Sequence, residues 1–227
     1  MFTLIALLAT ALAVPVAPAS LAGTGGDVAV RAQVGRVALR DGDCTREACE
    51  AVRHEATQGV EAGLQIAGVV GLYGQVEHVH DAIHAADYAG DGWGAGGGVR
   101  VGIPLGRVVG VHAWGELSGA RTTSDRGEST RIDLEAGAAV RVGDPLDGFV
   151  VWGGGAVIPW TSEDASLLDG AVEIRFTPTF PAQAVAGVLW ISDGLDGPWN
   201  ERARIGAGLN GRLGHRAGVE GWVGVTF

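Results

Sequence analysis

The chain has no lysine. Its 16 basic residues are all arginines, and they stand against 26 acidic residues, so the formal net charge is −10 at pH 7. Binding to nucleic acid requires clustered cations that neutralise phosphates, and this sequence contains no such cluster. The same charge balance argues against simple electrostatic adsorption to anionic lipid. The composition therefore excludes nucleic acid as an expected partner.

Long apolar runs are lacking after the N-terminal segment. A membrane-spanning helix needs about 20 apolar residues, and the one apolar run, Phe2–Ala13, is shorter and is followed by Pro15 and Pro18. Ser20-Leu21-Ala22 then fits the small-x-small pattern at which signal peptides are cleaved. We predict a secretory signal peptide at residues 1–22 and a single domain at residues 23–227. A single anchor helix is the alternative, which the prolines disfavour.

Cysteine is nearly absent, since Cys44 and Cys49 are the only two. Both lie in a polar stretch that is typical of a loop, and in an exported chain two cysteines are expected to form a disulfide. The alternative is a metal site that includes His54, which continues the five-residue spacing, but no fourth ligand is evident. We predict a Cys44–Cys49 disulfide and no cofactor.

Aromatic residues make up only 6% of the chain, whereas glycine contributes 39 residues. So much glycine weakens helices and ordinary strands, but it suits a barrel, in which strands bend and backbones pack closely. From residue 27 onward, apolar residues alternate with small, polar or charged ones, the period of a β-strand. The alternating segments are about ten residues or longer. Strands of globular proteins are typically about 5–6 residues, whereas transmembrane β-strands need about 9–11, so the pattern favours transmembrane strands.

The two faces of these strands differ in chemistry. One face is Val, Ile, Leu, Ala and Phe throughout, and the other carries charged residues of both signs. In a membrane barrel the apolar face meets lipid and the charges pair inside, whereas a soluble barrel reverses the arrangement. Alternation alone does not distinguish the two. The predicted interior charges are Arg31, Glu61, Arg100, Glu116, Asp133, Glu135, Arg141, Glu173, Arg175, Arg202, Arg204 and Glu220.

The C-terminus favours the membrane barrel. The chain ends in Val223-Gly224-Val225-Thr226-Phe227, with Val223, Val225 and Phe227 on one strand face. This ending resembles the terminal strand of bacterial outer-membrane proteins, which the barrel-assembly machinery reads. The resemblance implies a Gram-negative outer-membrane protein, surrounded by outer-membrane lipid, whose fold is all-β: an antiparallel up-and-down transmembrane barrel similar to the small OmpA-like and porin-like families.

The alternating pattern divides into eleven segments, but bacterial single-chain barrels have an even number of strands. Residues 58–80 keep one parity from Val60 to Val76 and contain no Asn, Asp or Pro turn. We therefore predict that 58–67 and 70–80 form one strand, which gives ten, with eight to twelve open. Short and long links should lie at opposite ends of the barrel. The expected short links are 104–106, 144–148 and 179–183, and the long ones are 41–57, 80–91, 119–130, 161–168 and 193–201.

Candidate catalytic and metal sites are incomplete. His78 and His80 share a strand face and His84 follows, and imidazoles suit zinc, copper or nickel, but no full ligand set is evident, so we predict no metal. Outer-membrane lipid A deacylases, which the chain resembles in export and architecture, need His and Ser on adjacent strands, whereas His112 and Ser118 share one strand, six residues apart.

Proteases of the omptin type use Asp and His at the rim of the loops. His80, Asp81 and His84 lie near such a rim without a recognisable pattern. We predict a non-enzymatic barrel with a structural, surface-interaction or small-solute passage role. The alternatives are an outer-membrane enzyme that acts on lipid or peptide, and a soluble exported barrel that binds an apolar ligand inside.

Overall fold

The computed structural model describes most of the chain after residue 24, in segments that correspond to the strands and several of their links. The described residues are 25–40, 50–66, 69–83, 88–144, 148–167, 173–175, 182–192, 204–214 and 216–226. The signal peptide predicted at 1–22 and the cysteine pair Cys44 and Cys49 lie outside them. No helix among these residues is both long and apolar enough to cross a membrane.

The described residues form eleven strands. They are β1 (Gly25–Arg40), β2 (Glu50–Ile66), β3 (Val70–Ile83), β4 (Tyr88–Pro104), β5 (Val109–Ser124), β6 (Gly127–Val142), β7 (Gly148–Leu167), β8 (Glu173–Arg175), β9 (Ala182–Ile191), β10 (Arg204–Gly214) and β11 (Arg216–Thr226).

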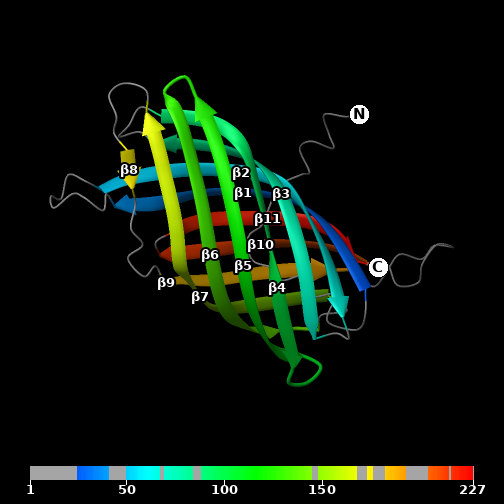
Figure 1. Ribbon diagram of the computed structural model, residues 1–227. Helices are drawn as coiled ribbons and strands as arrows, with labels where there is room; N and C mark the ends of the chain where they lie inside the picture. Colours follow the sequence, from blue (N-terminus) through cyan, green and yellow to red (C-terminus); the bar gives the residue numbers. More distant parts are fainter. Residues whose placement is uncertain are drawn as a thin grey trace, which may run out of the picture.

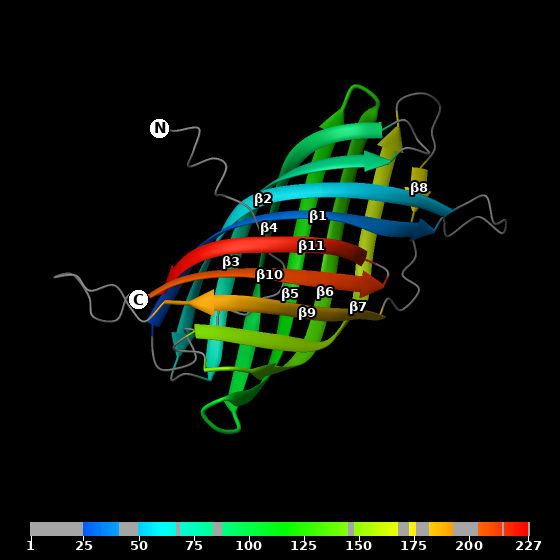
Figure 2. The same cartoon turned by 180° about the vertical axis from the view of Figure 1, so that it is seen from behind.

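Ten of these strands close into a barrel, which Figures 1 and 2 show from opposite sides. Each pairs antiparallel with its neighbours in the order β1-β2-β3-β4-β5-β6-β7-β9-β10-β11, and β1 then pairs with β11 from Asp27 opposite Thr226 to Val37 opposite Arg216. The three-residue β8 pairs with β7 alone. The prediction of an antiparallel up-and-down barrel with ten strands is confirmed.

The ten strands are not the ten that the sequence predicted. Residues 58–80 were expected to be one strand, but β2 ends at Ile66 and β3 begins at Val70, and the two pair along their length. The segment 168–178, predicted to be a strand of the barrel, is not one of the ten, and the structure describes only its three-residue β8. Because three residues link β2 to β3, outward positions stay even-numbered on both strands, so the turn left no break in the alternation.

This exchange changes where the links lie. We call the end at which β1 begins and β11 finishes the terminal end, and the opposite end the loop end. The links after β2, β4, β6 and β9 lie at the terminal end, and those after β1, β3, β5, β7 and β10 at the loop end. The predicted short link 179–183 belongs to the loop end, because β8 is not a strand of the barrel and one link joins β7 to β9 there. The predicted long link 193–201 joins β9 to β10 and therefore belongs to the terminal end.

Several predicted loops are strand instead. The segment 119–130 is the end of β5, a two-residue turn at Asp125 and Arg126, and the start of β6, and 161–167 completes β7. Because these residues are polar, the sequence pattern predicted loops here. They are polar because the strands continue past the apolar part of the outer wall, where their side chains meet water and not lipid.

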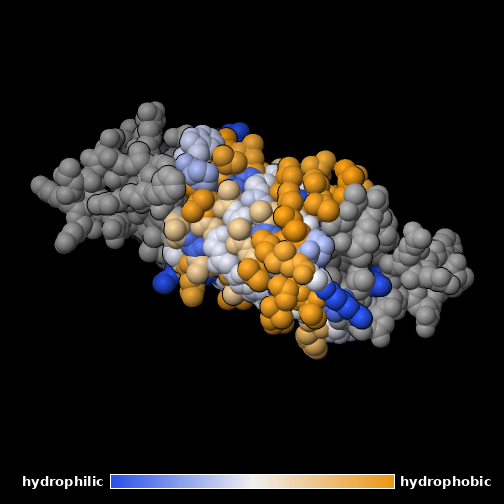
Figure 3. Space-filling view, turned by 90° about the horizontal axis from the view of Figure 1, so that it is seen from below, coloured by the Kyte–Doolittle hydropathy of each residue, from blue (hydrophilic) through white to orange (hydrophobic). Residues whose placement is uncertain are grey.

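The apolar face of the strands is on the outside. Val76 and Leu117 are 56% and 54% exposed, whereas Arg31 and Asp133, on the other face, are each 2% exposed. Hydrophobic side chains cover much of the described surface in the view from below (Figure 3). The apolar stretch of outward residues runs over 109–117 on β5 and 132–142 on β6, which matches the roughly 9–11 residues that span a bilayer. This orientation is opposite to that of a soluble barrel with an apolar interior.

Candidate functional site: the lumen of the barrel

The predicted interior charges that the structure describes point into the lumen. Arg31, Glu61, Arg100, Glu116, Asp133, Glu135, Arg141 and Glu220 are buried, each at most 7% exposed, and Arg204 is half-buried. Glu173 and Arg175 belong to β8, whose side chains are not described, and Arg202 lies outside the described residues.

Arg100 organises the cluster nearest the terminal end. Its Nη2 donates to both carboxylate oxygens of Asp27, at 2.6 and 2.9 Å, and its Nη1 donates to Glu61 Oε1 at 3.3 Å. Glu61 Oε2 in turn lies 3.3 Å from Arg31 Nη1. The guanidinium also stacks over the Tyr73 ring, 5.4 Å from its centroid. These contacts join β4 to β1 and β2 inside the barrel.

Two glutamates define the middle level of the lumen. Glu135 Oε2 accepts from Arg212 Nη1 at 2.6 Å and from Gln183 Nε2 at 2.9 Å, and its Oε1 accepts from Trp114 Nε1 at 3.1 Å. Glu116, its direct cross-strand partner, is held by neutral donors: Tyr73 Oη at 2.7 Å and Gln75 Nε2 at 3.0 Å. Like charges opposite each other are unfavourable, and these donors offset the repulsion.

The cluster nearest the loop end crosses the lumen. Arg131 on β6 makes a bidentate ion pair with Glu55 on β2. Its Nε lies 2.9 Å from Asp133 Oδ2. Arg53, also on β2, donates from Nη2 to Ser129 Oγ on β6 at 2.8 Å and pairs with Asp81 at 3.0 Å. In the ring of ten strands, β2 and β6 are four apart, so these bonds connect nearly opposite walls.

Six residues of these clusters were not among the predicted interior charges, although they share the parity of those that were. Arg131 is in phase with Asp133 and Glu135 on β6, and Glu55 is in phase with Glu61 on β2. Arg53, Glu55 and Asp81 fell in segments predicted to be loops, 41–57 and 80–91. Asp27, Arg131 and Arg212 lay in the predicted strands on the inward parity, and the prediction left them out. The six are Asp27, Arg53, Glu55, Asp81, Arg131 and Arg212.

An apolar cluster fills another part of the described lumen. Trp114, Trp152 and Trp222 are at most 8% exposed and form one cluster with Val150, Val185, Leu189 and Ile191 among others. Each indole lies over a glycine directly across on the adjacent strand: Gly137, Gly187 and Gly208, respectively. The missing side chains of these glycines make the room that the indoles fill. None of these three tryptophans was among the predicted interior residues, which were all charged.

Glu220 and His112 stand apart from the paired groups. Both are buried, and neither the carboxylate oxygens of Glu220 nor Nε2 of His112 has a hydrogen-bond partner among the described residues. Glu220 borders a small cavity of about 10 Å³, near Arg212 and Glu55, which is about the space of one water molecule.

Comparison with known proteins shows the fold. No protein-family model and no curated protein matches the sequence. Among solved structures, the chain is similar to the translocator domain of the autotransporter NalP from Neisseria meningitidis, with a TM-score of 0.52 and 15% identity, over 90% of this chain and 88% of that one. The CymD monoaromatic hydrocarbon channel is 11% identical, over 92% and 90% of the two chains, but its TM-score is only 0.26. The barrel is of the outer-membrane type, and membership of the OmpA-like or porin-like families stays a prediction.

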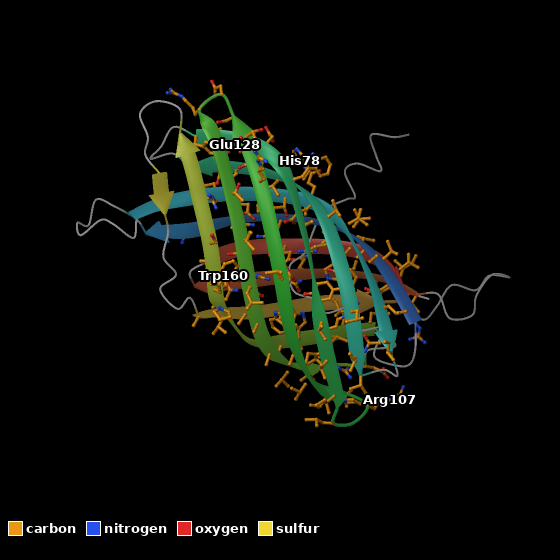
Figure 4. The ribbon with its side chains drawn as sticks, in the orientation of Figure 1. His78, Arg107, Glu128 and Trp160 are labelled. Carbon is orange, nitrogen blue, oxygen red and sulfur yellow. The ribbon has the colours of Figure 1, made fainter. Side chains whose placement is uncertain are left out.

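The predicted histidines lie on the outer wall near the loop end. His80 Nδ1 and His78 Nε2 are 3.0 and 4.0 Å from Asp91 Oδ1, and the His78 ring meets the edge of Trp93 at 5.4 Å. Within the described residues, no group of three or more candidate ligands is arranged to hold a metal ion. His84 lies outside the described residues. Figure 4 shows His78 and Glu128 toward the loop end and Arg107 at the terminal end.

The residues considered for catalysis are not brought together. His80 faces outward, whereas the neighbouring Asp81 faces the lumen and pairs with Arg53. His112 and Ser118 both face inward on β5, but six residues of strand separate them by about 20 Å at the usual rise of about 3.3 Å per residue. Val223 and Val225 face outward on β11, and Phe227 lies outside the described residues.

Proposed function

We propose that the protein is a closed, non-enzymatic outer-membrane barrel, which spans the bilayer without passing solutes and presents its loop end at the cell surface. The observation that carries this proposal is the set of bonds across the lumen, above all Arg131 to Glu55 and Arg53 to Ser129. In a small barrel, interior side chains fill the lumen. Here they also link the walls by buried, charge-assisted hydrogen bonds.

The apolar cluster also supports a closed lumen. Trp114, Trp152 and Trp222 lie in the same lumen as the ion pairs, so polar contacts and packed indoles both fill the interior. A water-filled pore would instead line these positions with hydrated polar groups. The arrangement therefore favours a structural or surface role over small-solute passage.

The unequal strand lengths support a role at the surface. β7 has 20 residues and β2 and β4 have 17 each, whereas about 9–11 residues suffice to cross a bilayer. The exposed Arg121–Glu128 pair and the exposed His80–Asp91 pair lie on the outer wall near the loop end, above its apolar part. Terminal-end turns face the periplasm in barrels of this type, so the projecting wall would face the outside of the cell.

Fractionation and conductance test the proposal. The full-length chain should appear in the outer membrane, need detergent for extraction, and run as a band that shifts on boiling. The refolded protein should then give no stepwise conductance in a planar lipid bilayer, whereas a Glu55→Ala/Arg131→Ala variant should conduct. A soluble periplasmic band without a heat shift would overturn the membrane barrel. Steady single-channel conductance of the unmodified protein would overturn the closed lumen and favour solute passage.

A further inference from the structure

The outer wall carries a groove of about 360 Å³ over β7, β9, β10 and β11, near the terminal end. Its lining consists only of apolar residues and glycines, among them Phe149, Trp190, Ala207, Leu209, Gly221 and Val223. Three of these four strands are the shortest of the barrel: β9, β10 and β11 have 10, 11 and 11 residues.

The groove results from the order of large and small outward side chains. Phe149 and Trp190 are direct cross-strand partners on β7 and β9, and they are 70% and 42% exposed, so both stand out from the wall. Beside them, Ala207 on β10 and Gly221 on β11 are small outward residues. The surface is therefore low over β10 and β11 and bounded on one side by two aromatic rings.

The position of the groove determines what can fill it. Phe149 and Trp190 lie near the strand ends at the terminal end, where aromatic rings of membrane proteins sit at the level of the lipid headgroups. From there the groove extends along β10 toward Leu209, in the direction of the bilayer centre. Because its lining has no charged side chain, an apolar chain is the occupant that it fits.

We propose that this groove binds one acyl chain of a membrane phospholipid. The inference rests on the proposed membrane-spanning role, which puts the terminal end at the periplasmic leaflet. A volume of about 360 Å³ lies near the lower limit of small-ligand sites, which run from about 300 to 1,000 Å³. A second copy of the chain would have to cover far more surface, since stable interfaces bury more than about 1,000 Å² in total.

Native mass spectrometry of the barrel, refolded in micelles that contain phosphatidylethanolamine, tests the proposal. Ala207→Leu fills the floor of the groove. Ala113→Leu makes the same change at an outward alanine on β5, away from the groove. The unmodified protein and Ala113→Leu should each retain one phospholipid. Ala207→Leu should retain it about tenfold less well, because its added methyl groups displace about one or two buried methylene groups of the chain.

Two outcomes would overturn the lipid site. One is equal retention, or no retention, by all three proteins. The other is a dimer that Ala207→Leu alone disrupts, which would make the groove an interface between copies. A heat shift shown by all three proteins would establish that each is folded, so loss of the lipid site would leave the proposed barrel intact. Absence of the heat shift from the unmodified protein would count against the proposed function itself.

Discussion

Trp222 on β11 lies directly across from Gly208 on β10, with its indole so close that a Cβ at residue 208 would be 2.5 Å from Nε1 and 2.8 Å from Cε2. An indole held in a packed cluster cannot move aside as the end of a flexible chain would. The pair therefore fits only because residue 208 has no side chain, and it links the high glycine content of the chain to the filling of its lumen.

Gly208→Ala should lower the stability of the barrel. We expect a loss of about 1–3 kcal/mol, the usual range for overpacking, partly offset by about 0.4–1 kcal/mol from the lower entropy of the unfolded chain. Urea unfolding in detergent, followed by tryptophan fluorescence, would measure the change. Gly211→Ala is the matched control on the same strand, since a Cβ there meets nothing closer than 4.0 Å. Equal midpoints for the two variants would contradict the close fit at Gly208.

Arg131→Met should be strongly destabilising. The substitution leaves Glu55 and Asp133 without the buried cation that pairs with both, and breaking a buried ion pair in this way typically lowers stability by about 3–5 kcal/mol. Arg121→Met is the control, because the Arg121–Glu128 pair joins the neighbouring strands β5 and β6 and is exposed, and exposed pairs contribute about 0–1 kcal/mol. The measurement is the midpoint of chemical unfolding of each variant, and that of Arg131→Met should be clearly the lower. Similar midpoints would mean that the ion pair across the lumen contributes little to the stability of the barrel.

Glu135→Gln and Glu220→Gln should act in opposite directions. Glu135 accepts three hydrogen bonds, one of them from Arg212, so the loss of its charge should destabilise the barrel. Neither oxygen of Glu220 has a hydrogen-bond partner among the described residues, and a buried carboxylate without partners is unfavourable by about 1 kcal/mol or more. Glu220→Gln should therefore stabilise. The test is chemical unfolding of both variants at neutral pH, and destabilisation by Glu220→Gln would show that its attraction to Arg212 dominates.

The sequence pattern revealed the faces of the strands better than it revealed their ends. Parity along each strand placed Arg31, Glu61 and Asp133 on the inner face, because each outward or inward position repeats every two residues. The same parity could not show the turn after Ile66, since a three-residue link leaves it unchanged. It also could not show which inward residues contact one another. Glu55 and Arg131 are 76 residues apart in the chain, and only the closure of the barrel makes them partners.

The terminal residues offer a test of assembly separate from stability. We propose that Val223, Val225 and Phe227 act as a signal for the barrel-assembly machinery, and Val223 and Val225 lie outward on β11, which pairs with β1 to close the barrel. Phe227→Ala should therefore reduce the amount of heat-shifting protein in the outer membrane of cells, while the same variant refolded in detergent keeps the unfolding midpoint of the unmodified protein. Thr226→Ala, one position earlier, is the control and should assemble normally. If Phe227→Ala lowered the midpoint in detergent as much as it lowered assembly, Phe227 would act through packing, and its role as a recognition signal would be wrong.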